Sequence, residues 1–305
     1  MKTLGFDTSN YTTSIAYFDG VAGVHCSQLL PVKPGELGLR QSDAVFSHIK
    51  SLPELSGRLF SDLEDQNEIS AIAVSTRPRA VEGSYMPCFM VGYSHAKMLS
   101  DALRVPLFEV SHQQGHVAAC LWSAGRLDLM DQPHLAWHLS GGTTELLLVE
   151  PKGRNVTCTK IGGTTDISAG QLIDRTGVML KLPFPAGKHL DALAANSSCR
   201  DVFKVKCPGL EFSLSGVQNK VQQYANDHSP EDTAAYALRC VCYAVSAATQ
   251  NAKKAYPGLE VVFSGGVTAN SMLRSVMQDC IFCDPKFSTD NAMGVAVLAS
   301  RLLEE

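Results

Sequence analysis

The sequence contains no long uninterrupted run of apolar residues. No stretch of about 18 such residues occurs, so no membrane-spanning helix is predicted. Residues 1–7 do not form the apolar core of a signal peptide, because Asp7 interrupts them. We therefore expect a cytoplasmic protein that has no membrane partner.

A surplus of positive charge is also absent. The chain has 26 Lys and Arg against 30 Asp and Glu, a formal net charge of −4, and no stripe of basic residues stands out. Proteins that hold nucleic acid by themselves usually show such a surplus. If nucleic acid is the substrate, we expect partner proteins to supply much of the phosphate-binding surface.

Several common site motifs are missing. The chain lacks G-x-x-x-x-G-K-[ST] and G-x-G-x-x-G, which argues against P-loop and Rossmann proteins. It also lacks H-E-x-x-H and G-x-S-x-G, so no protease site is predicted. Among ten cysteines, only Cys280 and Cys283 form a C-x-x-C pair, and no second pair completes a structural zinc site. We interpret the cysteines as reduced thiols, mostly buried.

The segments that are present predict an α/β protein with two lobes. A length of 305 residues with 45% hydrophobic content suits two domains of roughly 150 residues each. Strand-like and helix-like runs alternate, which favours mixed sheets. We expect residues 1–115 and 290–305 to form one lobe and residues 116–289 the other. Strands are predicted at 4–7, 14–18, 69–75, 105–110, 134–139, 144–149 and 260–263, and helices at 89–103, from 111, at 168–180, 190–195, 234–255 and 290–303.

Three polar loops lie at predicted strand ends: Asp7–Thr13, Ser140–Thr144 and Ser264–Asn270. Glycine lets a backbone approach a phosphate closely, and exposed N–H groups can bind oxygen anions. The predicted helix after Gly266 would add a favourable partial charge. Each loop alone is more often an ordinary turn. Their arrangement favours the actin/hexokinase-like (ASKHA) ATPase fold, in which two lobes hold a nucleotide in a central cleft.

A pair of histidines stands at the predicted helix start. His112 and His116 are four residues apart, so they share a face and can reach one cation. A solvated or buried pair without metal is the alternative. A third ligand must come from elsewhere, and Asp290 is a candidate, although aspartate there is also a good N-cap. Asp174 and Asp191 lie among small residues, and each has a structural alternative: an ion pair with Arg175 and a helix cap, respectively.

Several segments together resemble the tRNA threonylcarbamoyladenosine transferase family (TsaD-like), formerly called glycoproteases or O-sialoglycoprotein endopeptidases. The order of the motifs is specific, from the two histidines through S-G-G-x-T and G-G-V-x-A-N-x-x-L-R to T-D-N. The resemblance covers residues 4–16, 111–116, 139–146, 165–175, 182–191, 211–216, 265–274 and 288–296. It implies an acyltransferase that moves a threonylcarbamoyl group from its adenylate to the adenosine beside the tRNA anticodon. The alternatives are a paralogue acting as an ATPase or a carbamoyl-type transferase on another substrate, and a non-catalytic scaffold subunit.

The resemblance also implies site residues, cofactors and partners. The implied metal ligands are His112, His116 and Asp290, holding one divalent or ferric ion, with iron or zinc expected. Other implied ligands are ATP or threonylcarbamoyl-adenylate with Mg²⁺. The implied partners are subunits of a tRNA-modification complex, with tRNA bound only weakly by the chain itself. The expected assembly is a homo- or heterodimer. The implied substrate and nucleotide contacts are Leu139, Ser140, Gly141, Gly142, Thr143, Asp174, Gly187, Asp191, Gly266 and Asn270.

The sequence departs from the family pattern around the first loop. An acidic pair is usual there, but this chain has Tyr11 and Thr12. A Gly-Pro-Gly turn is replaced by Arg77-Pro78-Arg79. Asp7 and Thr12 are the catalytic candidates that remain in this region. We expect transfer to be weak or redirected, because neither tyrosine nor threonine is a good base at neutral pH.

Overall fold

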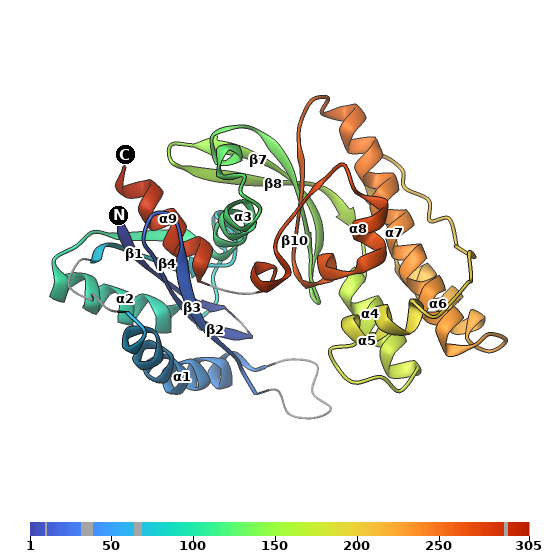
Figure 1. The fold of residues 1–305 in the computed structure, drawn as a ribbon, viewed down its shortest axis with the longest axis horizontal. Helices are drawn as coiled ribbons and strands as arrows, with labels where there is room; N and C mark the ends of the chain where they lie inside the picture. Colours follow the sequence, from blue (N-terminus) through green and yellow to red (C-terminus); the bar gives the residue numbers. More distant parts are fainter. Residues whose placement is uncertain (10, 32–38, 64–68, 290–291, 305) are drawn as a thin grey trace. The chain divides into compact units, whose positions relative to one another are not determined.

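The computed structural model describes residues 1–9, 11–31, 39–63, 69–289 and 292–304 (Figure 1). The chain divides into two compact units. Unit 1 comprises Met1–Pro133, Glu150–Cys158 and Thr289–Glu305, and unit 2 comprises His134–Val149 and Thr159–Ser288. This division differs from the predicted boundary between residues 115 and 116, which would cut through a helix that belongs wholly to unit 1.

Unit 1 is built on a mixed five-stranded sheet of order β3-β2-β1-β4-β5. β1 pairs antiparallel with β2 and parallel with β4, which is parallel to β5. The strands are β1 (Lys2–Ser9), β2 (Thr12–Phe18), β3 (Gly23–Leu29), β4 (Ile69–Arg77) and β5 (Leu107–Ser111). The helices are α1 (Gln41–Ser61), α2 (Phe89–Leu103), α3 (His112–Ser123), the 3-10 helix η2 (Leu127–Asp131) and α9 (Met293–Leu303).

Helices cover both faces of this sheet, with α1 and α2 on one face and α9 on the other (Figure 1). Successive side chains of a strand point to opposite faces. Leu4 and Phe6 of β1 therefore pack in the apolar cluster with α1 and α2. Thr3 and Gly5 face α9, where the Thr3 hydroxyl donates to the Ala296 carbonyl at 2.7 Å. Asp7 follows in the same alternation, on the α9 face.

Glycines allow α3 and α9 to approach each other at backbone distance. A Cβ added at Gly294 would overlap the carbonyl of Gly115 in α3. A Cβ added at Gly5 would overlap the backbone of Ala296 in α9. These contacts attach the last helix and α3 to the sheet of unit 1. They explain why all of α3 belongs to that unit.

Unit 2 is built on a six-stranded sheet of order β11-β10-β6-β7-β8-β9. β6 pairs antiparallel with β7 and parallel with β10. The strands are β6 (His134–Leu139), β7 (Thr144–Lys152), β8 (Asn155–Thr164), β9 (Glu211–Phe212), β10 (Val261–Ser264) and β11 (Ile281–Phe282). The helices are α4 (Ala169–Met179), α5 (Gly187–Ala194), α6 (Ser215–Tyr224), α7 (Pro230–Ala255), α8 (Ser271–Val276) and the 3-10 turns η3 (Gly266–Ala269) and η4 (Pro285–Phe287).

The core of unit 2 lies between this sheet and α7. Trp137, Phe212 and Phe263 are buried and pack against apolar residues of α7. The Trp137 indole N–H donates to the Thr249 hydroxyl of α7 at 2.9 Å, so the polar atom of this buried ring has a partner. The long helix is thereby fixed to the central strand β6.

The α/β class with mixed sheets is confirmed, and several elements match their predicted bounds. The helix at 89–103 and the strand at 134–139 agree at both ends. The helix predicted directly after Gly266 is wrong in detail, because a 3-10 turn intervenes and α8 begins at Ser271. The final helix begins at Met293, three residues later than predicted. Across the described part of the chain, no helix has the length and apolar character needed to cross a membrane.

Candidate functional site

In unit 1 a buried carboxylate holds one of the two histidines. Asp7 is fully buried near the end of β1. The hydroxyl of Ser75, from the neighbouring strand β4, donates to Asp7 Oδ1. His112 Nδ1 lies 3.0 Å from Oδ1 and 3.1 Å from Oδ2 of the same carboxylate. An ionised carboxylate can only accept, so this contact places the proton of a neutral His112 ring on Nδ1 and makes Nε2 the acceptor nitrogen of the ring.

The two histidines meet through the same ring atoms. α3 begins at His112, after Ser111 and Gln114 form a capping box. The four-residue spacing brings His112 Nε2 and His116 Nε2 to 2.9 Å from each other. Two imidazole Nε2 atoms this close, one of them oriented by a carboxylate, are a donor pair that fits a transition metal such as iron or zinc. The residues present therefore fit the implied metal.

The third predicted ligand, Asp290, lies outside the described residues. Within residues 1–9, 11–31, 39–63, 69–289 and 292–304, no group of three or more His, Cys, Asp or Glu side chains is arranged to hold a metal ion. The described part of the site is thus the histidine pair with Asp7 behind it. The complete ligand set stays a prediction.

Thr12 lies on the same face of the sheet as Asp7. The β1–β2 register pairs Asp7 with Ser14 and Ser9 with Thr12, and directly paired residues share a face. The Thr12 side chain is buried, whereas Tyr11 is 41% exposed in the turn between the strands. Tyr11 therefore faces solvent at the edge of unit 1, and Thr12 lies further along the Asp7 face.

The Arg77-Pro78-Arg79 segment lies at the start of α3. Arg77 pairs with Ser111 across β4 and β5, and the carbonyl of Pro78 accepts a hydrogen bond from the backbone N–H of Gln113 at 3.0 Å. The segment that replaces the glycine-rich turn of the family thus borders the first turn of α3, which carries His112. It adds two guanidinium groups near that end of the sheet.

In unit 2 the glycine-rich loop after β6 forms a tight turn. Ser140 N–H donates to the Thr143 carbonyl at 2.8 Å, and Thr143 N–H donates to the Ser140 hydroxyl at 3.1 Å. Gly141 and Gly142 are exposed, and open space surrounds the position of an added Cβ at each. The preceding Leu139 is fully buried and anchors the loop. The tip of the loop is accordingly exposed.

The start of α4 contacts the backbone of this loop. The N-cap Ser168 donates through its hydroxyl to the Gly141 carbonyl at 2.6 Å. An added Cβ at Gly170 would overlap the Ser140 carbonyl, so only glycine allows this approach. On the other side, Gly265 has a φ of +94°, and an added Cβ there would overlap the Leu139 carbonyl. The loop is therefore held between α4 and the end of β10.

Asp191 and Asn270, both predicted to contact the substrate or nucleotide, are hydrogen-bonded to each other although they are distant in the sequence. The amide of Asn270 donates to Asp191 Oδ1 at 2.7 Å. Asp191 Oδ2 accepts from the backbone N–H of Ser271 at 3.0 Å. Asn270 is also the N-cap of α8, accepting from Leu273 N–H at 2.9 Å. Asp191 thus stabilises the start of α8, and it is hydrogen-bonded to the residue that ends η3, the 3-10 turn beginning at Gly266.

Asp174 of α4 contacts the backbone just before Gly187, the first residue of α5. Asp174 Oδ1 accepts from the backbone N–H of Ala186 at 2.9 Å, just before Gly187 begins α5. Burial raises the pKa of the Asp174 carboxyl, although this hydrogen bond opposes the shift. The alternative ion pair with Arg175 is not the contact observed, because Arg175 donates to Gln218 at 2.6 Å. An added Cβ at Gly187 would meet open space.

Two residues with clear roles at these sites were missed by sequence reasoning. Ser75 donates to Asp7, and its only signal was its place at the end of a strand parallel to β1. Asp166 accepts hydrogen bonds from Ser213, Leu214 and Ser215 and so fixes the start of α6 against β8. Burial raises the pKa of Asp166, but these hydrogen bonds outweigh it and hold the pKa well below its usual value.

Solved structures with a similar fold confirm the predicted fold class. Full-length HypF in its phosphate- and nucleotide-bound form has a TM-score of 0.62 and 14% identity, covering 100% of this chain and 47% of its own. Component A of the (R)-2-hydroxyglutaryl-CoA dehydratase of Acidaminococcus fermentans has a TM-score of 0.58 and 14% identity, with 100% of both chains covered. A ROK family glucokinase from Streptomyces griseus has a TM-score of 0.54 and 10% identity, covering 99% of this chain and 100% of its own. These neighbours are ASKHA-type proteins, so the chain has the ASKHA fold; at such identities they show the fold alone.

Sequence relatives and a family model identify the family to which the chain belongs. The tRNA N6-adenosine threonylcarbamoyltransferase of Chlorobium chlorochromatii is 28% identical, over 98% of this chain and 92% of its own length. The protein of that name from Streptococcus suis is 33% identical, over 68% and 61%. Residues 38–297 match the family model for TsaD, tRNA N6-adenosine threonylcarbamoyltransferase. The chain therefore belongs to the TsaD family of transferases.

Proposed function

We propose that this protein transfers a threonylcarbamoyl group from its adenylate to the exocyclic amine of the adenosine beside the tRNA anticodon. Membership of the TsaD family supports the reaction class. The observation that carries the proposal is the histidine pair of α3, with Nε2 atoms 2.9 Å apart and His112 oriented by buried Asp7. A protein that had kept only the fold would have no need of a histidine pair oriented in this way.

His112 and His116, together with Asp290, would hold one metal ion, with iron or zinc expected. When bound, the ion supplies a Lewis acid that polarises an oxygen of the carbamoyl or phosphate group. Asp7 acts by fixing the tautomer and the orientation of His112. Second-sphere partners of this kind typically change metal affinity or activity by about 10–100-fold.

The loop and helix starts of unit 2 would hold the adenylate. The exposed backbone of Gly141 and Gly142 suits phosphate oxygens, because no atom of the described residues lies within 4 Å of an added Cβ at either glycine. Gly187 offers similar open space, and the Asp191–Asn270 pair supplies polar groups for the ribose or base. Leu139, Ser140, Thr143, Asp174 and Gly266 build or position these contacts. Holding both substrates in place converts a bimolecular reaction into a step within one complex.

The transfer step needs a place for one proton. The amine nitrogen attacks the carbamoyl carbon, the bond from that carbon to the phosphate oxygen breaks, AMP leaves, and the amine loses a proton. A positioned base typically contributes about 10²–10⁴-fold to such a step. At the positions of the family's acidic pair, this chain offers the hydroxyl groups of Tyr11 and Thr12, which are poor general bases. Asp7 is already engaged by Ser75 and His112. We propose that transfer is slow for this reason.

Restoring the acidic pair tests this account. The assay contains tRNA, threonine, bicarbonate, ATP, the adenylate-forming enzyme and partner subunits of a tRNA-modification complex. We expect Tyr11→Glu combined with Thr12→Glu to raise the transfer rate, by up to about 10²-fold if the pair acts as a base. Tyr11→Phe with Thr12→Ser is the matched control and should leave the rate unchanged. A wild-type rate equal to that of a family member with the acidic pair would contradict the reasoning.

The Arg77-Pro78-Arg79 segment favours a second candidate function. Arg77 and Arg79 add positive charge beside the start of α3, where the family has glycine. Such charge suits a more anionic substrate, so we propose as the alternative an ATPase or a carbamoyl-type transferase acting on a small molecule. ATP hydrolysis without any tRNA, lost in His116→Ala and faster than transfer, would favour this alternative. The retained histidine pair disfavours the third alternative, a non-catalytic scaffold subunit that only dimerises with an active transferase.

A further inference from the structure

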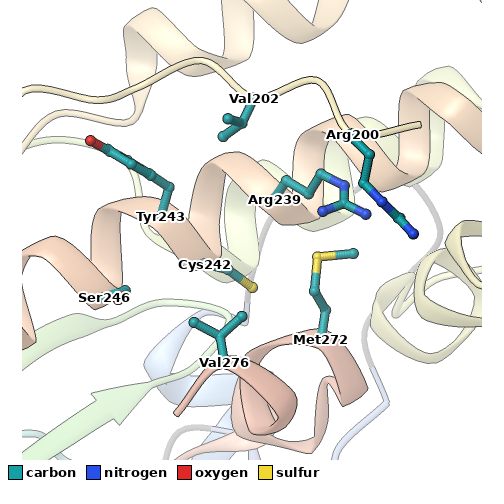
Figure 2. A pocket seen from close by; sticks show the side chains of 8 residues that line it. All are labelled: Arg200, Val202, Arg239, Cys242, Tyr243, Ser246, Met272 and Val276. Atoms are coloured by element: carbon teal, nitrogen blue, oxygen red, sulfur yellow. The ribbon is translucent and has the colours of Figure 1, made fainter. Parts of the chain in front are cut away.

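Unit 2 contains a cavity of about 220 Å³ that none of the predicted site residues lines. It lies between α7, α8 and the segment that precedes β9 (Figure 2). Arg239, Cys242 and Tyr243 of α7 form one wall. The other walls include Met272 and Val276 of α8, and Arg200.

The lining of this cavity carries positive charge in the part of the chain that the structure describes. Its lining has two arginines and no acidic residue. Arg239 Nε is buried and has no hydrogen-bond acceptor among the described residues. Figure 2 shows both guanidinium groups at the same end of the cavity, above Met272. A buried donor without a partner is unfavourable, and two like charges on one cavity add to this cost. An anion in the cavity would remove both penalties.

The remainder of the lining is neutral and mostly apolar. Burial raises the pKa of the Cys242 thiol to about 12, so this side chain is uncharged at neutral pH. Met272, Val276 and the Tyr243 ring supply carbon and thioether surface. A cationic end joined to an apolar body is the arrangement of a site for a small organic acid, since pockets are mostly apolar with a few polar groups that fix orientation.

We propose that this cavity binds a small organic acid, whose carboxylate or phosphate group contacts Arg239 and Arg200 and whose apolar part packs against Met272 and Val276. Guanidinium groups match both oxyanions in bidentate geometry. The volume of about 220 Å³ is below the roughly 300–1,000 Å³ of pockets for drug-sized ligands, so the ligand is smaller than a nucleotide. The site is independent of the proposed transfer reaction.

Calorimetric titration of the full chain tests this inference with three probes of similar size: benzoate, phenyl phosphate and neutral benzyl alcohol. We expect at least one acid to bind and benzyl alcohol to bind at least about tenfold more weakly, because hydrogen bonds to a charged group are stronger than those to a neutral one. Binding of benzoate alone would identify a carboxylate site, and binding of phenyl phosphate alone a phosphate site. No binding by either acid, or equal binding of benzyl alcohol, would overturn the proposal.

Arginine variants locate the binding. Arg239→Met keeps an unbranched side chain and removes the guanidinium group with its charge, and it should weaken acid binding about tenfold or more. Arg200 is exposed, so Arg200→Met is not expected to affect folding and should weaken binding as well if Arg239→Met does not fold. Exposed Arg58 of α1 provides the control, and Arg58→Met should leave the affinity unchanged. Unchanged affinity in Arg200→Met and in folded Arg239→Met would refute the site.

Discussion

Replacement of Asp7 by asparagine removes the buried carboxylate that contacts His112. Asp7 accepts from the Ser75 hydroxyl and from His112 Nδ1 at 3.0 Å, and it is fully buried. Asparagine keeps the shape but offers one acceptor oxygen instead of two, and its amide N–H₂ opposes the N–H of His112. Hydrogen bonds to charged groups contribute about 1.5–3 kcal/mol each, so we expect Asp7→Asn to lower the free energy of unfolding by roughly that amount.

The same change should weaken metal binding through His112. Loss of the carboxylate frees the ring to rotate and to change tautomer, so we expect metal affinity to fall about 10–100-fold. Competition with a chelator of known affinity measures this, with elemental analysis of the purified proteins beside it. Asp101→Asn is the matched control in unit 1, because Asp101 forms only an exposed pair with Lys97 and such pairs contribute little. Equal metal affinity in wild type and Asp7→Asn would refute the role assigned to Asp7.

Further outcomes are expected. Elemental analysis should find about one tightly held ion per chain, and equal metal in wild type, His112→Ala and Asp290→Ala would exclude the predicted ligands. ATP, ADP or AMP with Mg²⁺ should raise the melting temperature, less so in Asn270→Ala or Asp174→Ala, and no shift at millimolar nucleotide would argue against the nucleotide site. The isolated chain, with a net charge of −4, should not bind tRNA with submicromolar affinity at physiological salt, as a filter assay can check. The pKa of Asp166 is lower in the folded protein than its usual value of 3.8, so this carboxylate contributes its full stabilisation above pH 3.8 and loses it as the pH falls through the folded pKa. Asp166→Asn should therefore be less stable than wild type near pH 7 and equally stable in strong acid. A stability difference that persists in acid would contradict this.

Elements with strong local patterns were predictable from the sequence. α2 and β6 have buried apolar residues at helical or strand spacing, and their bounds follow. β3 was missed because only Cys26 of its seven residues is buried, as expected for an edge strand. α6 was missed because only Val217 and Val221 of its ten residues are buried. In both cases the tertiary neighbours, and not the local pattern, decide the structure.

Contacts between distant segments could be predicted only in part. The four-residue spacing of His112 and His116 is a local signal, and the structure brings their Nε2 atoms together. The link from His112 to Asp7 spans 105 residues and depends on the order of β1, β4 and β5 in one sheet. The Asp191–Asn270 bond likewise depends on where α5 and α8 meet. Spacing along the chain contains no information about such encounters.

Mass analysis of nucleosides from tRNA tests the central claim most directly. Unmodified tRNA is incubated with the purified chain, its partner subunits and threonylcarbamoyl-adenylate, then digested. The account predicts threonylcarbamoyladenosine with the wild-type chain, at a low rate, and none above background with His116→Ala. Absence of the product with wild type, in a mixture where a family member with the acidic pair forms it, would contradict the claim.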